Sequence, residues 1–587
     1  CLYGRCDMYT FDEKFKKGAA RAFRAQNGMT AFLGGLNKLL PEPPAFGECK
    51  TKEEEPTVAR IADTAGDRWY LGFSEQSIVP RDVGEKAYYI GGNLSLPPRR
   101  VRGVLDDIKV RVIALSDGEE KAAEIFCVVD CIGLTNTTVR RIRRELDSFS
   151  RTDNVGYINV FSTHAHSSID TMGIWSVTGK KFFKNISKLI SRGQPEPSVD
   201  GEFIDRIIRK TKKAVAEAVG NMEPGRLYAA QIGTNSIEKL EKYSEEKPYD
   251  DMTLDEYGMR DFLFAKRPPR EYSPRLNRLR FVPDNKASRP TVLANFGAHP
   301  YANGLKIKSN KGNMLSADFP FYMERTVNEA GENFIFFNAA VNGIYPRRGA
   351  GGVKEENFTR QTEALGRDLG KLVLAMTKER DEIEKSPLLS PENSGEAYKD
   401  AVERIGRGSA KERELEPKLT SVHKKIALRV DNSLEKMIGK LGFACFDMTR
   451  PEKGVYELET ETGYLELGGD FKAVLVPGEI TPGLVSGTGD MLAENSITGE
   501  ASDFKSICDI VGGDTAVFGL ANDALGYIIP DNDYCMFFAG YGKLAEKLFF
   551  KDYAHYQEMF SIGAHTASTF SAGVEGMMKS FRELPGK

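Results

Sequence analysis

The sequence predicts a mixed fold, α/β to α+β, in which one large domain holds mixed β-sheets flanked by helices. Short apolar runs with the two-residue period of β-strands alternate along the chain with longer segments that have the helical period. The chain has 587 residues, of which 41% are hydrophobic. That is enough apolar material for the core of one large domain or of two moderate ones.

The first 66 residues are predicted to form an amphipathic helix and a linker, and residues 67–587 the folded domain. Helical periodicity in residues 11–40 places apolar side chains among lysines and arginines, at Phe15, Ala19, Phe23 and Leu33. Such a helix is expected to pack on the body or to rest on a membrane surface. Residues 41–56, rich in proline and glutamate, have the composition of a linker.

From Arg68 onward, strands and helices are expected to alternate. Apolar or alternating runs predict strands over residues 107–115, 124–129, 156–162, 291–296, 425–430, 455–460 and 473–476. Amphipathic periodicity predicts helices over residues 137–146 and 201–219, and further helices that begin at Phe319 and Thr359. The Lys/Glu-rich residues 380–417 are predicted to be a polar, solvated insertion.

The small net charge excludes a partner that is attracted by a strong electrostatic field of the whole protein. The net charge is −3, from 81 basic and 84 acidic residues, so we expect no nucleic-acid partner. No run approaches the roughly 20 apolar residues that span a bilayer. The chain starts at Cys1 without an initiator methionine. We expect it to be extracytoplasmic or membrane-associated if an export signal has been removed upstream, and cytoplasmic otherwise.

The eight cysteines show no Cys-x-x-Cys pair and no zinc-ribbon spacing. A disulfide framework is therefore not expected. Cys127 and Cys131 lie in or beside the apolar run 125–129 and are predicted to be small buried thiols rather than metal ligands.

Three of the six histidines lie at the ends of predicted strands. His164 and His166 follow the strand that ends at Ser162, and side chains two residues apart on extended chain point to one face. Both imidazoles can therefore reach one metal ion or one substrate. A pair of surface or hydrogen-bonded histidines has the same spacing, so both interpretations stay open at this point.

His299 and Glu479 also come directly after apolar strands. Strand ends present side chains to clefts, although a core histidine bonded to a carbonyl would fit the position of His299 as well. Two imidazoles and a carboxylate would leave open coordination at a zinc ion. Spacing alone does not bring these residues together.

A resemblance to a known family indicates that these residues belong to one site. Short motifs follow one another in a fixed order: Thr-His-Ala-His-Ser at 163–167, His299–Pro300, Leu-Ser-Ala-Asp at 315–318, Val-Pro-Gly-Glu at 476–479, and Leu520–Asn522 leading to Tyr527. In this order, over approximately residues 68 to 570, the chain resembles the catalytic domain of the neutral, non-lysosomal ceramidases. The resemblance implies one large ceramidase-like catalytic domain.

The resemblance also implies a catalytic metal site. It implies a Zn²⁺ ion held by four side chains, those of His164, His299, Glu479 and Tyr527. His166 would belong to the catalytic centre. Asp318 would orient the substrate or a ligand, but it is equally suited to be the N-cap of the helix that starts at Phe319. Asp130 is a weaker candidate for the same orienting role.

The chain departs from the family where the ceramidases carry their active-site serine. In the corresponding segment, residues 338–346, Tyr345 stands before Pro346 in place of that serine. A phenol with a pKa of about 10 is a poor nucleophile at neutral pH, so Tyr345 is expected to donate a hydrogen bond or to fill space. The immunoglobulin-like C-terminal domain of ceramidases is not expected either. The segments 129–134 and 169–175 resemble bacterial ceramidase-like proteins more closely.

The expected function is that of a zinc-dependent hydrolase that cleaves an amide (N-acyl) or ester bond through zinc-activated water. His166 would handle a proton and stabilise the oxyanion. The expected substrate is a small-molecule or lipid-like amide. An apolar, deep pocket would favour acyl chains, and a polar, open one a soluble amide such as a peptide-like or cell-wall fragment. The alternative is a degenerate relative that binds a lipid or glycan without cleaving it. Surface or structural roles are expected for the other histidines, His423, His555 and His565.

Overall fold

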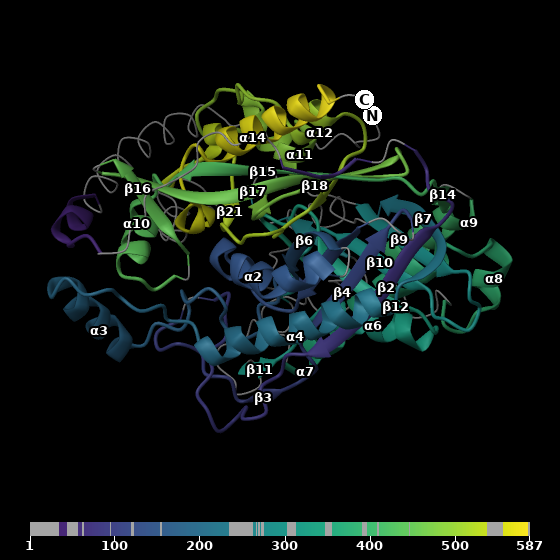
Figure 1. The fold of residues 1–587 in the computed structure, drawn as a ribbon, viewed down its shortest axis with the longest axis horizontal. Coiled ribbons are helices and arrows are strands. Elements are labelled where there is room, and N and C mark those ends of the chain that lie inside the picture. The colour runs from purple at the N-terminus through teal and green to yellow at the C-terminus, as the bar shows by residue number, and fades with distance from the viewer. Residues whose placement is uncertain are drawn as a thin grey trace, which may run out of the picture.

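The computed structural model of the chain describes residues 34–43, 57–61, 64–93, 95–118, 122–152, 155–233, 262–265, 267, 271, 275–301, 313–346, 355–389, 396–407, 410–444, 446–452, 454–536 and 556–584. Two large β-sheets pack face to face, and helices cover their outer faces (Figure 1). The mixed fold with helix-flanked mixed sheets that the sequence predicts is therefore confirmed.

The larger sheet has nine strands among the described residues, antiparallel in its centre and parallel at both edges. Its order is β12 (Asn333–Asn338), β10 (Thr291–Phe296), β9 (Arg275–Pro283), β7 (Glu223–Gly233), β2 (Trp69–Ser77), β4 (Lys109–Ser116), β5 (Ala123–Val129) and β6 (Val155–Ser162), with β14 (Arg413–Leu415) beside β7. Strands β5 and β10 are fully buried, and most of their residues are apolar. These apolar runs are the pattern that predicts both strands from the sequence.

The smaller sheet has six strands in the described part of the chain. Its order is β1 (Thr57–Arg60), β15 (Leu419–Arg429), β17 (Val455–Leu467), β18 (Phe471–Leu475) and β20 (Ala516–Phe518), with β16 (Met448–Glu452) beside β17. Three two-stranded pairs complete the strands of the described ranges: β3 (Gly103–Val104) with β11 (Met314–Leu315), β8 (Leu263–Ala265) with β13 (Ile344–Pro346), and β19 (Glu479–Ile480) with β21 (Tyr527–Ile528).

Aromatic side chains fill the space between the two sheets. The ring of Phe161 in β6 lies 5.0 Å from that of Phe337 in β12 and 6.2 Å from that of Phe518 in β20. All three are buried, and aromatic rings of this size contribute much of the apolar area removed from water on folding. The contact also shows that the larger sheet is strongly curved, because its two edge strands β6 and β12 come together.

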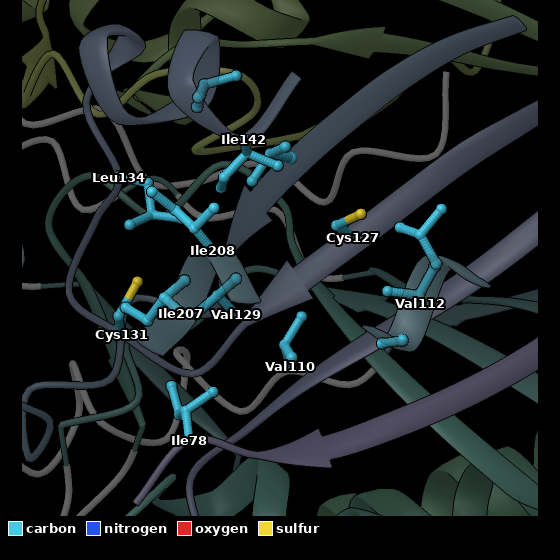
Figure 2. Close-up of a cluster of buried hydrophobic side chains, with 14 of the residues drawn as sticks. Ile78, Val110, Val112, Cys127, Val129, Cys131, Leu134, Ile142, Ile207 and Ile208 are labelled. Carbon is cyan, nitrogen blue, oxygen red and sulfur yellow. The ribbon is translucent and has the colours of Figure 1, made fainter. Parts of the chain in front are cut away.

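Most of the helices cover the outer faces of the two sheets. The helices of the described ranges are α2 (Asn136–Thr152), α3 (Gly179–Ile190), α4 (Gly201–Gly220), α6 (Phe319–Glu329), α7 (Glu355–Ala375), α8 (Arg380–Lys385), α9 (Glu396–Gly406), α10 (Ser433–Lys440), α11 (Pro482–Ser486), α12 (Ile507–Val511) and α14 (Thr566–Arg582). Helix α3 instead packs beside α10 at one end of the molecule. Helix α4 packs on β2 and β4, and α2 packs on β6 and α4. Ile207 and Ile208 of α4 pack near Val110, Val129 and Cys131 (Figure 2). Cys127 and Cys131 are free and fully buried in this cluster, as predicted.

The segment 380–417 differs from its predicted character as a solvated insertion. It contains α8, α9 and β14, and Ile383, Tyr398 and Ile405 are buried in the core cluster that α7 and β7 share with these helices. Its apolar side chains are few but lie on one face of each helix, so a composition average hides them. The division of the chain at residue 66 stays a prediction, although Thr57–Arg60, on the N-terminal side of that division, pairs with β15.

Residues 11–33 of the expected N-terminal amphipathic helix lie outside the described residues, and residues 34–39 are helical. Among the helices of the described ranges, none is both long and apolar enough to cross a membrane.

Candidate metal centre

Three parallel strand pairs end close to one another and define the site. The pairs are β5 with β6, β10 with β12, and β18 with β20. The side-chain amide of Asn338, at the end of β12, donates to the carbonyl oxygens of Ser162 and Thr163 at 3.3 and 2.7 Å. The N–H of Ser162 donates to the carbonyl of Leu520, which follows β20. The carboxyl ends of parallel strands are where open α/β sheets place their ligand sites.

Three buried histidines meet at this edge, and each directs its Nδ1 at a backbone carbonyl. The Nδ1···O distances are 2.7 Å for His164 and Ile132, 3.1 Å for His166 and Gly92, and 2.6 Å for His299 and Ile344. A carbonyl oxygen only accepts hydrogen bonds, so each Nδ1 carries the proton. In the neutral imidazole the Nε2 atom then keeps its lone pair, the form in which histidine binds a metal. Burial lowers the pKa of His299, which favours that neutral form.

The Nε2 atoms converge together with one carboxylate. His166 Nε2 lies 3.0 Å from His164 Nε2, and Glu479 Oε2 lies 2.9 Å from His299 Nε2 and 3.2 Å from His164 Nε2. The ligand atoms of the three histidines all lie within 4.8 Å of one another. Burial alone would raise the pKa of Glu479, but positive charge on the adjacent imidazoles and their hydrogen bonds outweigh it and hold this pKa at about 2. The carboxylate thus favours a positive charge, a proton or a metal ion, at the point where the Nε2 atoms meet.

Acceptor atoms that face one another in this way repel unless a proton or a cation lies between them. The Nδ1 protons are already engaged with carbonyls, and Glu479 is ionised, so the donor set fits a divalent cation. The buried cluster of His164, His166 and His299 can therefore hold a metal ion. Imidazole nitrogens with a carboxylate suit zinc and other transition metals such as iron, nickel and copper.

Two glycines allow Glu479 and Tyr527 to lie side by side in the short parallel pair β19–β21. A Cβ on Gly478 would lie 2.6 Å from the carbonyl oxygen of Gly526, and one on Gly526 would lie 1.9 Å from that of Phe560. Gly526 also has a φ of 85°, which side chains rarely adopt. The glycine before Glu479 is thus required by close backbone approach, which explains the Pro-Gly-Glu sequence.

Backbone strain concentrates at the same place. Among the described non-glycine residues with positive φ, four surround the strand ends: His164 at 63°, Asp318 at 63°, Leu520 at 51° and Asn522 at 61°. Each such conformation typically costs of order 1–3 kcal/mol and persists only where the surroundings determine it. The side chain of Asn522 accepts from the N–H of Val160 at 2.8 Å and so holds this turn against β6.

Tyrosines cover the side of the cluster next to His299. The ring of Tyr345 stacks on that of His299 with centroids 4.9 Å apart, and its hydroxyl contacts the hydroxyl of Tyr556. The hydroxyl of Tyr527 donates to Tyr556 at 3.4 Å, and Tyr301 packs on His166 with centroids 4.5 Å apart. Burial raises the pKa of Tyr556 to about 12 and that of Tyr527 as well, so both phenols are protonated at neutral pH.

The two other acidic candidates lie beside the site rather than among the converging atoms. Asp318 is the N-cap of α6, where its carboxylate accepts from the N–H of Phe319 at 2.9 Å, as one of the two expectations for it states. Its orienting role stays a prediction. Asp130 is fully buried and forms an ion pair with Arg111 at 2.8 Å.

The remaining described histidines lie elsewhere. His423 is buried in β15 and stacks on Tyr157 with ring centroids 3.6 Å apart, and the side chain of His565 is 73% exposed beside Asp531. His555 lies outside the described residues. Three partners of the site could not be recognised from the sequence: the carbonyl of Gly92 and the rings of Tyr301 and Tyr556. None of these residues lies in a recognisable sequence motif, and only the fold brings them close to the histidines.

A pocket opens from the metal candidates along an apolar wall. His164, His166, Glu479 and Tyr527 line one end. Most of the wall consists of apolar side chains from several elements, Ile132, Met172, Ile174, Trp175, Phe446, Leu458, Leu520, Leu525, Phe560 and Ile562. Polar and charged residues also line it, among them Arg140, Glu435, Asp447, Glu459 and Asp523. Buried Asp170 shapes part of it, because its carboxylate accepts from the N–H groups of Met172, Gly173 and Trp175.

The solved structures that share this fold include two of ceramidases. One is a crystal structure of the neutral ceramidase from Pseudomonas aeruginosa, with a TM-score of 0.55 and 12% identity, over 88% of this chain and 75% of that chain. The other is a ceramidase complexed with C2, with a TM-score of 0.53 and 13% identity, over 89% of this chain and 76% of that chain. No protein-family model matches the chain, and no curated protein matches it in sequence. The fold is thus ceramidase-like, and it carries a buried histidine cluster suited to a metal.

Proposed function

We propose that this protein is a zinc-dependent hydrolase that cleaves an amide (N-acyl) or ester bond in a lipid-like substrate. The observation that carries the proposal is the convergence of three histidine lone pairs and the ionised Glu479 at the end of an apolar pocket. The ceramidase-like fold supports it, since the two similar solved structures are ceramidases.

We assign the metal to His164, His299, Glu479 and Tyr527. Glu479 Oε2 lies within 3.2 Å of Nε2 of both His164 and His299, so these three donor atoms surround one small space. Tyr527 lies beside Glu479 in the β19–β21 pair and lines the same pocket. A zinc ion held there would lower the pKa of a water molecule and polarise the substrate carbonyl.

His166 is assigned to proton transfer. Its Nδ1 proton is held by the carbonyl of Gly92, so its Nε2 atom is the acceptor that faces the reaction space. The Nε2 atom can take a proton from the attacking water and return it to the leaving amine or alcohol. We assign Tyr345, which stacks on His299 and whose hydroxyl contacts that of Tyr556, as a hydrogen-bond donor in place of a serine nucleophile.

The pocket wall favours an acyl chain. Met172, Trp175, Leu458 and Phe560 present apolar surface, and burial of each methylene of a chain contributes about 0.8 kcal/mol to binding. A soluble polar amide would gain little from that wall. A lipid-like N-acyl or ester substrate therefore fits the lining best.

The test combines metal analysis with a substrate panel. Purified protein is stripped with chelator, reloaded with zinc and assayed on amides and esters with acyl chains of increasing length. We expect near-stoichiometric zinc, activity that requires it, and turnover that rises with chain length. Full zinc content with no hydrolysis of any amide or ester would contradict the hydrolase and favour a binding protein.

Tyr345→Phe is expected to lower turnover while leaving zinc content unchanged. Loss of one hydrogen-bond donor from an oxyanion site typically costs about 3 to 4 kcal/mol at most. The matched control is Tyr398→Phe, a buried tyrosine in α9 that bonds the carbonyl of Leu389, which should leave turnover unchanged. An inactive Tyr345→Phe with full zinc, together with an acyl adduct on wild-type Tyr345 by mass spectrometry, would instead identify Tyr345 as a nucleophile.

A further inference from the structure

One end of the molecule exposes apolar side chains on two helical segments. Five of the eight exposed large apolar residues in the described ranges belong to residues 34–39 and to α3. They are Leu36 at 38% exposure, Leu39 at 80%, Phe182 at 37%, Phe183 at 71% and Ile190 at 70%. Single exposed apolar residues are ordinary, but a concentration on neighbouring segments indicates an interaction surface.

Both segments are fixed to α10, so they form one surface. The side-chain amide of Asn37 donates to the carbonyl of Ser433 at 2.6 Å, and Lys440 Nζ donates to the carbonyl of Asn37 at 2.9 Å. On α3, the amide of Asn185 donates to the carbonyl of Leu441 at 2.7 Å. Figure 1 shows α3 and the purple helix 34–39 at the same end of the molecule, at the left. We call residues 34–39 and α3 the α10 surface.

The charge of the α10 surface is positive. Helix α3 carries Lys180, Lys181, Lys184 and Lys188 and no acidic residue. The last three share one carboxylate, that of Glu196, at 3.3, 2.8 and 2.5 Å. Arg192 and Lys38 add further positive charge at the ends of the two helices. Exposed aromatic and aliphatic side chains among lysines are typical of helices that lie in a membrane interface.

We propose that the α10 surface docks on an anionic lipid bilayer, with Leu39, Phe183 and Ile190 entering the interface and the lysines of α3 facing lipid headgroups. The surface also lies next to the pocket. Ile174 and Trp175, a few residues before α3, line it, and so does Glu435 on α10. A lipid held at this surface would therefore lie close to the residues that line the pocket. Docking itself requires neither metal nor hydrolysis, so it is tested separately from the proposed activity.

The test is co-sedimentation of the full chain with vesicles of phosphatidylcholine alone and with added phosphatidylglycerol. Wild-type protein should partition at least about tenfold more strongly onto the anionic vesicles, and high salt should reduce that difference. Phe183→Ser/Ile190→Ser and Lys180→Glu/Lys184→Glu should each weaken partition at least about tenfold. These side chains are exposed, so circular dichroism and thermal unfolding should match those of wild type.

Two matched variants serve as controls. Leu105→Ser removes an exposed leucine outside the α10 surface, and Lys385→Glu reverses a charge on α8, at the opposite end of the molecule in Figure 1. Both should bind vesicles as wild type does. Equal binding of wild type to neutral and anionic vesicles, or unchanged binding of the α3 variants, would overturn the proposal. So would self-association through this face, seen as a dimer in sedimentation equilibrium that Phe183→Ser/Ile190→Ser dissociates.

Discussion

His164→Ala is expected to remove both the bound metal and the hydrolytic activity. His164 Nε2 is the central atom of the cluster, within 3.0 Å of His166 Nε2 and 3.2 Å of Glu479 Oε2. Loss of a side chain that only orients a ligand already costs about 10- to 100-fold in metal affinity, so loss of a ligand should cost more. Zinc content after dialysis and turnover on the best substrate of the panel should both fall to background.

His565→Ala is the matched control, since the side chain of His565 is 73% exposed and lies beside Asp531 rather than in the cluster. It should retain near-stoichiometric zinc and full turnover. His423→Gln, at a buried position in β15, should retain zinc as well. If His164→Ala kept its zinc, or if His565→Ala lost it, the ligand assignment would be wrong.

Arg111→Met is expected to destabilise the folded protein by about 3–5 kcal/mol, the usual cost of removing one partner from a buried charge network. Arg111 is 3% exposed and pairs with Asp130 at 2.8 Å and with Glu324 at 2.6 Å. Burial alone would raise the pKa of Glu324, but Arg111 and Lys109 outweigh it and hold this pKa at about 2. The substitution leaves two buried carboxylates with much of their compensation removed.

Urea unfolding followed by fluorescence, in the presence of chelator, measures this effect without a contribution from bound metal. The matched control is Arg325→Met, which removes an arginine of α6 whose ion pair with Glu329 is more than half exposed. That pair should be worth less than about 1 kcal/mol. Equal effects of the two substitutions would show that the buried network does not stabilise the end of β5. Arg111→Met/Glu324→Gln should recover part of the loss.

The regular elements that the sequence revealed are those whose side chains follow one clear period. β10 has the predicted limits, residues 291–296, and β6 and α4 agree within one residue at each end. The sequence did not predict strands β7 and β9. Charged residues interrupt their apolar residues, so neither strand shows a clear apolar run. Their place in the sheet depends on pairing with strands far away in sequence, which no local pattern encodes.

For the site, the sequence indicated that His164, His299 and Glu479 each follow a strand, but their spacing did not show that they lie together. The resemblance to ceramidases supplied that connection, and the structure brings the three donor groups together. The sequence separated His166 from the metal ligands, whereas its Nε2 lies within the same histidine cluster. Its role depends on which lone pair faces the metal, and that follows from the carbonyl of Gly92, a backbone contact with no sequence signature.

The most direct test of the metal site is a crystal structure of zinc-loaded protein with anomalous data collected on both sides of the zinc absorption edge. We predict one strong anomalous peak about 2.0–2.2 Å from His164 Nε2, His299 Nε2 and a carboxylate oxygen of Glu479. The apolar pocket should open from that peak. The absence of a peak at these three side chains, or a peak held by other residues, would contradict the proposed zinc site.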